Sequence, residues 1–108
     1  MALPLNVFQT VALDVPAVAT EVYTAPTGYN SIVLLAQACN TDTNPQTVTL
    51  YHKRGATSTA LVFDYEIPPS ETLVLISGRL VLETGDSLEL SGSDTEVKFV
   101  ASILETLK

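Results

Sequence analysis

Oxygen-bearing side chains occupy alternate positions in one short stretch of this sequence. Asn40, Asp42 and Asn44 stand two residues apart within the segment CNTDTNPQTVTLY, residues 39–51. Calcium-binding loops present carboxylate and amide oxygens with this spacing, so the segment is the first candidate for metal chemistry. The same residue types are frequent in turns between strands, where their side chains bond to nearby backbone groups.

The other positions of the segment favour the turn. Counted from Asn40, a calcium loop needs glycine at the sixth place and a bidentate glutamate at the twelfth. Pro45 and Tyr51 stand there instead. We therefore expect a structural hairpin turn without a bound metal, and no motif elsewhere indicates a cofactor.

Nucleophilic catalysis would have to use the only cysteine and the only histidine. Cys39 and His52 lie across one expected hairpin in an apolar neighbourhood, and the sequence has no G-x-S-x-G elbow. We expect a buried, inert thiol and a structural histidine whose ring nitrogens are hydrogen-bonded. The prediction is that the chain has no catalytic residues and is not an enzyme.

Three carboxylates, Glu83, Asp86 and Glu89, cluster in the segment LETGDSLEL. Paired acids are the groups that glycoside hydrolysis uses. Here they surround a turn at Gly85, for which we expect a positive φ angle, and no tryptophan exists to hold a sugar. We therefore interpret these acids as turn and surface residues.

A receptor- or carbohydrate-binding module stays open as an alternative. Its sign would be a concave surface lined by aromatic residues, built from Tyr23, Tyr29, Tyr51 and Tyr65. Only Tyr51 lies clearly on the polar phase of an expected strand.

Charge and hydropathy exclude two classes of partner. Twelve acidic residues against five basic ones give a formal net charge of -7, which would repel a nucleic-acid backbone. The longest apolar run, IVLLA at 32–36, is far shorter than the ~20 residues of a membrane-spanning helix. The first residues also lack the basic and apolar pattern of a secretory signal. We expect neither nucleic acid nor membrane as a partner.

Apolar and polar residues alternate with the period of a half-buried strand in several segments. Val48, Leu50 and His52 share one phase of QTVTLYHK. Two further segments each place a set of apolar residues on one expected strand face. These sets are Leu61, Phe63, Tyr65 and Ile67 in LVFDYEI, and Val97, Phe99, Ala101 and Ile103 in EVKFVASI.

Short turn signals rich in Gly, Pro, Asn, Asp and Ser separate eight or nine expected strands, and no segment has a helical stripe. The strands are expected near 5–13, 18–24, 31–39, 46–53, 59–67, 71–77, 79–83, 86–91 and 96–104. The pattern predicts a single all-β domain over residues 1–108, an antiparallel β-sandwich or jelly roll without significant helix.

Two expected strands carry more apolar residues than one core can cover. SIVLLAQAC and TLVLI are apolar on both phases, as strands covered on both sides are. Bare apolar patches on a small domain invite aggregation, so we expect a partner to cover them. The candidate interface is Val33, Leu35, Val74 and Ile76, and we expect a homo-oligomer.

Three segments together resemble a group of short virion proteins of tailed bacteriophages. They are VYTAPTGYNSIVLLAQACNTD, FDYEIPPSETLVLISGRLVLETGDSLELSGS and the closing ASILE, and the similarity covers Gln9 to Glu105. The turn at Pro68, Pro69 and Ser70 departs from the family pattern, because it lacks the usual glycine.

The resemblance implies a structural β-domain of a phage particle, made in the bacterial host cytoplasm and installed on the virion. It implies no catalytic residues. A head decoration or cement protein on the particle exterior is the first placement, and a tail, neck or fibre-associated component is the alternative. Its partners would be copies of itself and virion proteins such as the major capsid or tail proteins. A trimer is preferred by analogy, since exterior phage parts often sit at three-fold or six-fold positions.

Overall fold

The protein is described by a computed structural model that covers residues 4–108. Nine strands follow one another: β1 (Asn6–Asp14), β2 (Thr20–Thr24), β3 (Tyr29–Asn40), β4 (Gln46–Arg54), β5 (Thr57–Ile67), β6 (Thr72–Val74), β7 (Leu80–Leu82), β8 (Ser87–Gly92) and β9 (Val97–Leu107). The described residues contain no helix, and so none that is long and apolar enough to cross a membrane.

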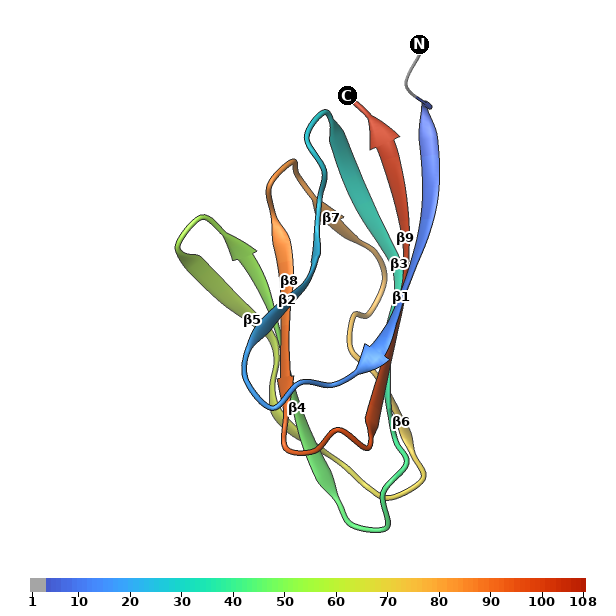
Figure 1. The fold of residues 1–108 in the computed structure, drawn as a ribbon, viewed down its shortest axis with the longest axis vertical. Helices are drawn as coiled ribbons and strands as arrows, with labels where there is room; N and C mark the ends of the chain where they lie inside the picture. The colour runs from blue at the N-terminus through green and yellow to red at the C-terminus, as the bar shows by residue number, and fades with distance from the viewer. Residues whose placement is uncertain (1–3) are drawn as a thin grey trace.

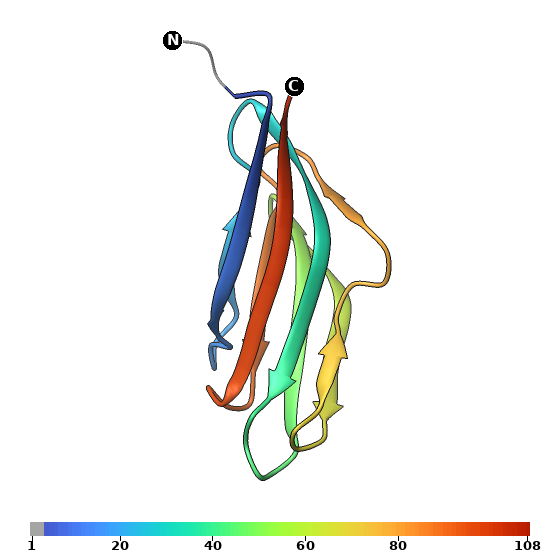
Figure 2. The same ribbon diagram turned by 90° about the vertical axis from the view of Figure 1, so that its right-hand side faces the viewer.

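The strands form two antiparallel sheets that face each other (Figure 1). Sheet A has the order β1-β9-β3, with β6 and β7 both pairing with β3, and sheet B has the order β2-β8-β4-β5. Figure 2 looks onto sheet A, in which β1 forms the left margin and β6 and β7 lie on the right. This is the jelly-roll arrangement of two four-position sheets, with one position divided between β6 and β7. The predicted fold class is confirmed.

The core lies between the sheets, where alternate residues of each strand point inward. The predicted inward residues of β9, Val97, Phe99, Ala101 and Ile103, are all at most 1% exposed. Val48 and Leu50 of β4 face them from sheet B and are fully buried. Regular alternation therefore predicts the core correctly where the strand itself is regular.

The expected strand 71–77 is shorter in the structure. Only Thr72–Val74 pairs with β3, and the chain then bends over residues 75–78 before β7 begins. Gly78 takes a positive φ of 82° in this bend. Ile76 consequently lies outside any strand and packs against the core from a half-buried position.

The expected common face of Leu61, Phe63, Tyr65 and Ile67 in β5 is wrong. Ile67 is 1% exposed, whereas Phe63 and Tyr65 are 70% and 54% exposed. The register between β4 and β5 shifts twice, and Asp64 has a positive φ of 48°. Each irregularity changes which side of the strand a residue faces, so the alternation in the sequence does not persist in space.

The turn that lacks the usual glycine places a serine where glycine is favoured. Ser70 has a φ of 63°, and its backbone N–H donates to the carbonyl of Asn40. The departure from the family pattern therefore leaves the left-handed turn conformation in place.

Candidate functional site

The four predicted interface residues divide between the core and the surface. Leu35 and Val74 are exposed, at 38% and 59%. Val33 is fully buried among the core residues of the chain itself, so its assignment to an outer face is wrong. The cause is a register shift in β3 between Val33 and Leu35, which lets both Leu34 and Leu35 face outward.

Leu35 and Val74 belong to a larger surface on the outer side of sheet A. Because paired residues on neighbouring strands lie on the same face, the register gives its members. Phe8, Leu104, Ile32 and Val81 are paired in sequence across β1, β9, β3 and β7 and form one continuous row. Ala12, Val100, Gln37 and Val74 form a second row across β1, β9, β3 and β6.

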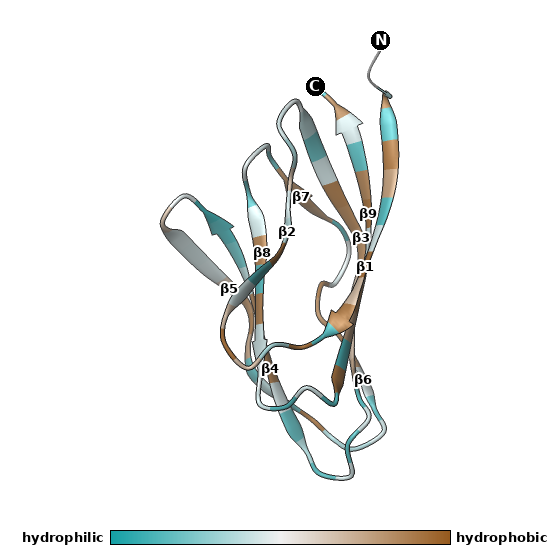
Figure 3. Cartoon of the chain, viewed as in Figure 1, coloured by the Kyte–Doolittle hydropathy of each residue, from teal (hydrophilic) through white to brown (hydrophobic). Residues whose placement is uncertain are grey.

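We call this surface the apolar face and define it by Phe8, Ile32, Leu35, Val74, Val81, Val100 and Leu104. Phe8 is 76% exposed and Val81 is 55% exposed, so the side chains at both ends of the first row are accessible to solvent. Hydrophobic segments recur along β1, β9 and β3 in Figure 3. The sequence did not indicate Phe8 and Val81 as surface residues, because the register that places them beside Leu104 and Ile32 cannot be derived from residue types.

Charge is nearly absent from the outer side of sheet A. Between the two rows the outward positions hold Thr10, Ser102 and Leu35, and the second row itself contains the uncharged Gln37. Asp14 and Lys98 are the only charged pair in this register, and they stand at the end of the sheet with the Lys98 Nζ 2.9 Å from the Asp14 Oδ1. This hydrogen bond raises the pKa of Lys98 above its ordinary value. A partner could therefore approach the apolar face without meeting an unpaired charge.

Over β2, β8 and β4 the outer side of sheet B has the opposite character, whereas β5 at the margin of that sheet exposes Phe63 and Tyr65. Glu21 of β2 is paired directly with Glu89 of β8, and Glu89 with Tyr51 of β4. The Lys53 Nζ lies 3.4 Å from Glu21 and 3.6 Å from Glu89, so it offsets the repulsion between the two carboxylates. Hydrated charges of this kind keep a surface in water.

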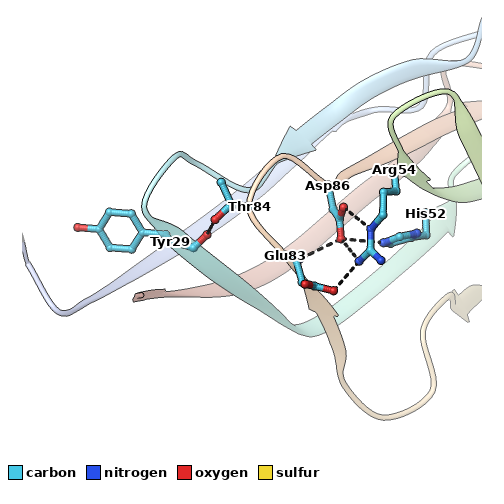
Figure 4. A network of polar contacts seen from close by, with 6 residues as sticks. All are labelled: Tyr29, His52, Arg54, Glu83, Thr84 and Asp86. Carbon is cyan, nitrogen blue, oxygen red and sulfur yellow. Dashed lines mark hydrogen bonds and ion pairs between the residues drawn. The ribbon is translucent and has the colours of Figure 1, made fainter.

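A polar network closes one end of the sandwich, where the turn between β7 and β8 meets β4 (Figure 4). Asp86 is 2% exposed and its carboxylate accepts from the Arg54 Nε at 2.8 Å and from the Arg54 Nη2 at 2.6 Å. His52 Nε2 lies 3.2 Å from the same carboxylate, and the backbone N–H of Glu83 donates to it at 3.0 Å. His52 therefore makes, through Nε2, the kind of internal hydrogen bond that is expected of a structural histidine.

Electrostatics of the network follow from these contacts. The hydrogen bonds from Arg54 hold the pKa of Asp86 well below its usual range, against the opposing effect of burial. The same contacts raise the pKa of Arg54. Asp86 is thus ionised at neutral pH and links β4 to the β7–β8 turn. No local sequence pattern predicts this ion pair, because Arg54 and Asp86 are 32 residues apart.

A second polar cluster joins the two sheets. The Tyr23 hydroxyl of β2 donates to the Glu105 carboxylate of β9 at 2.6 Å and lies 2.7 Å from the Ser31 Oγ of β3. Burial, reinforced by Glu105, raises the pKa of Tyr23 above its ordinary value. The Tyr23 hydroxyl is therefore engaged in hydrogen bonds inside the molecule.

The segment with calcium-like spacing forms a turn held by its own side chains. Asn40 is fully buried, and its Nδ2 donates to the carbonyls of Asn44 and Ile67, both at 2.9 Å. Its Oδ1 accepts the backbone N–H of Asp42 at 2.9 Å. The predicted turn is present, but it is not a hairpin, because it leads from β3 in sheet A to β4 in sheet B and these strands do not pair. Residues 4–108 bring together no group of three His, Cys, Asp or Glu that could hold a metal.

The remaining candidates for chemistry are separated in space. Cys39 is half-buried on the outer side of sheet A, whereas His52 belongs to sheet B, so they form no thiol–imidazole pair. The expectation of a fully buried thiol is therefore wrong.

The four tyrosines do not meet in one surface. Tyr23 and Tyr29 use their hydroxyls in contacts with Glu105 and with the carbonyl of Pro4. Tyr65 lines a small pocket of about 270 Å³ with Glu66, Ile67, Pro68, Glu71, Thr72 and Leu73. Tyr51 pairs with Glu89 on the outer side of sheet B, so the pocket at Tyr65 contains only one of the four tyrosines.

Comparison with known proteins identifies the fold. No family of proteins and no curated sequence matches the chain. A chain of the acid-stable capsid of Helicobacter pylori bacteriophage KHP30 superposes with a TM-score of 0.59 at 10% identity, over 96% of this chain and 89% of that chain. A protein of the disulfide-linked pili that are Bacillus endospore appendages gives 0.50 at 18% identity, over 95% and 89%.

A pentameric capsid protein from metagenomic phage sequences has a TM-score of 0.48 at 18% identity. The match covers 90% of this chain, which spans about 60% of the length of that protein. The chain of the phage KHP30 capsid, with a TM-score above 0.5, shows that this all-β sandwich fold also occurs in a phage capsid.

Proposed function

We propose that this chain is a non-enzymatic structural subunit of a bacteriophage virion, a head decoration or cement protein on the particle exterior. The apolar face of sheet A would rest on the underlying capsid protein, and the charged side of sheet B would face the solvent. The observation that carries the proposal is the contrast between these two outer sides, one nearly free of charge and the other ionic. Apolar contact of this kind contributes roughly 25 cal/mol per Å² of buried area.

The similar capsid chain of phage KHP30 supports the size of the proposed subunit. Because the match covers 96% of one chain and 89% of the other, the two are of nearly equal length. A chain this small can therefore occur as a separate part of a phage capsid. The net charge of -7 further favours an outward surface over contact with packaged DNA.

The decisive experiment is to count and locate this chain in purified virions of the phage that encodes it, by quantitative mass spectrometry and an image reconstruction. Hundreds of copies on the head would support the proposal. A few copies at the tail, neck or fibres would establish the alternative placement. Absence from the purified virion would overturn the structural role.

The orientation can be tested with particles that are produced without the chain. We expect the wild type to co-sediment with them and Val81→Lys to lose this binding by about tenfold or more, because a charge would be buried in the contact. Ser91→Lys is the matched control on the outer side of sheet B, and it should bind normally. Loss of binding in the control alone would reverse the proposed orientation.

The proposed partners are the major capsid protein and further copies of this chain. The three-fold assembly expected from the sequence rests on analogy, and no contact within the chain selects it. Glycan binding would require specific recognition that Tyr51→Ala or Tyr65→Ala abolishes, which a glycan array can measure.

A further inference from the structure

The four edges of the two sheets differ in how well they are protected against pairing with another strand. Sheet A ends in β6 and β7 on one side, which are only three residues long each. In sheet B, β2 has five residues and a register shift between Glu21 and Tyr23. The other margin, β5, combines two register shifts with a positive φ at Asp64. Short, charged or irregular strands are the usual means of preventing edge-to-edge association.

The remaining edge, β1, has none of these protections. It spans nine residues in unbroken register with β9. Its sequence NVFQTVALD contains no proline or glycine, and Asp14 at its end is its only charge. In Figure 2 it forms the left margin of sheet A. Long, regular and uncharged edge strands are templates for another strand.

The register shows which backbone groups are free along β1. Leu107 donates its N–H to Leu5, and Val15 donates to Val97. Bonded pairs alternate with non-bonded pairs in an antiparallel ladder, so the odd-numbered residues of β1 bond to β9. The even-numbered ones direct their N–H and C=O groups away from the sheet: Asn6, Phe8, Thr10, Ala12 and Asp14. Within residues 4–108 no other strand pairs with this edge.

We propose that β1 is a homodimer interface, at which the β1 strands of two copies pair antiparallel about a two-fold axis through Thr10. Thr10 is the midpoint of Asn6–Asp14, so this register lets the whole strand pair. Thr10 then faces Thr10 of the second copy, Phe8 faces Ala12, and Asn6 faces Asp14. All five free residues are paired with residues that also have free backbone groups.

The distribution of charge permits a second copy as the partner at this edge. Two chains of net charge -7 repel each other overall, so contact must occur where charge is lowest. No like charges face each other in the proposed register, since Asp14 meets Asn6 and is already paired with Lys98 of its own chain. The dimer would join two sheets A into one continuous sheet with an apolar face of double width. The inference goes beyond the virion role and does not depend on it.

Sedimentation of the whole chain tests the dimer. A dimer has twice the 11.5 kDa chain mass, 23.0 kDa. Thr10→Pro removes one free N–H and obstructs the edge without breaking a bond to β9, so we expect a folded monomer. Thr10→Val keeps the N–H and should remain dimeric. Circular dichroism and a thermal melt monitor the fold of each variant.

A charge exchange tests the register without relying on proline. Thr10→Lys and Thr10→Asp should each weaken dimerisation on the order of 100-fold, because two like charges would meet at the axis. A mixture of the two variants should recover a dimer that contains one chain of each. A mixture that stays monomeric would overturn the register, and a wild type that is monomeric or trimeric at every concentration would overturn the interface.

Discussion

The outer sides of the two sheets are built on the same alternation and yet have opposite chemistry. In both sheets every second residue leaves the core. In sheet A most of these residues are uncharged, with Phe8, Ile32 and Val81 among them, whereas in sheet B they include Glu21, Lys53 and Glu89. Alternation thus decides which side chains point outward, and the identity of those side chains decides whether the outward surface stays in water.

The clearest way to break this comparison is to place a charge on each side of sheet A. Val33→Glu should destabilise the protein by about 4 kcal/mol or more, since it buries a carboxylate in the core. Val74→Glu, at a position that is 59% exposed, should change the free energy of unfolding by less than about 0.5 kcal/mol. Urea denaturation measures both. Equal effects would mean that the inner and outer sides of the sheet are wrongly assigned.

The next largest effect should come from the polar network that ties the β7–β8 turn to β4. Asp86→Ala removes the acceptor of Arg54, His52 and the Glu83 N–H, and we expect a loss of about 2–3 kcal/mol. Glu83→Ala is the milder comparison, because the Glu83 side chain is 65% exposed and bonds only to Arg54. Thermal melts of the two variants should therefore differ clearly, and similar midpoints would refute the central role of Asp86.

Acid should act on the same network. The pKa of Asp86 is lower in the folded protein than in the unfolded chain. The ionised carboxylate therefore contributes stability that is fully present above the unfolded value of about 4 and is lost as the pH falls through the lower folded value. Unfolding free energies measured between pH 5 and pH 2 should fall less steeply in Asp86→Asn than in the wild type. Parallel curves would show that other carboxylates control the acid response.

The smallest effect concerns the turn between β7 and β8, at which the chain passes from sheet A to sheet B. Gly85 has a φ of 89°, and a Cβ there would meet no atom within 4 Å. The predicted positive φ is confirmed, and substitution should act only through backbone strain. Gly85→Val should cost about 1 kcal/mol, and Gly85→Asn should cost less, since Asn tolerates positive φ. An unchanged melting midpoint for the valine variant would contradict this reading of the turn.

Most of the architecture could be predicted from the sequence, because regular strands record their inward side in alternate residues. The buried residues of β4 and β9 followed this rule. It failed at the bulge after Val33 and near Asp64, where the backbone changes phase without a signal in residue type. The apolar face and the Arg54–Asp86 pair could not be predicted from the sequence either, because strand register brings together residues that are distant in the sequence.

The position of β9 has a consequence for how the molecule folds. β9 is the last of the nine strands in chain order, yet it lies between β1 and β3 in sheet A. It pairs residues as distant as Asn6 and Thr106, whereas all four strands of sheet B lie between Thr20 and Gly92. Distant pairings form slowly, so we expect sheet A to close after sheet B. The apolar face therefore exists only in a completed subunit, which makes the end of folding the moment at which assembly can begin.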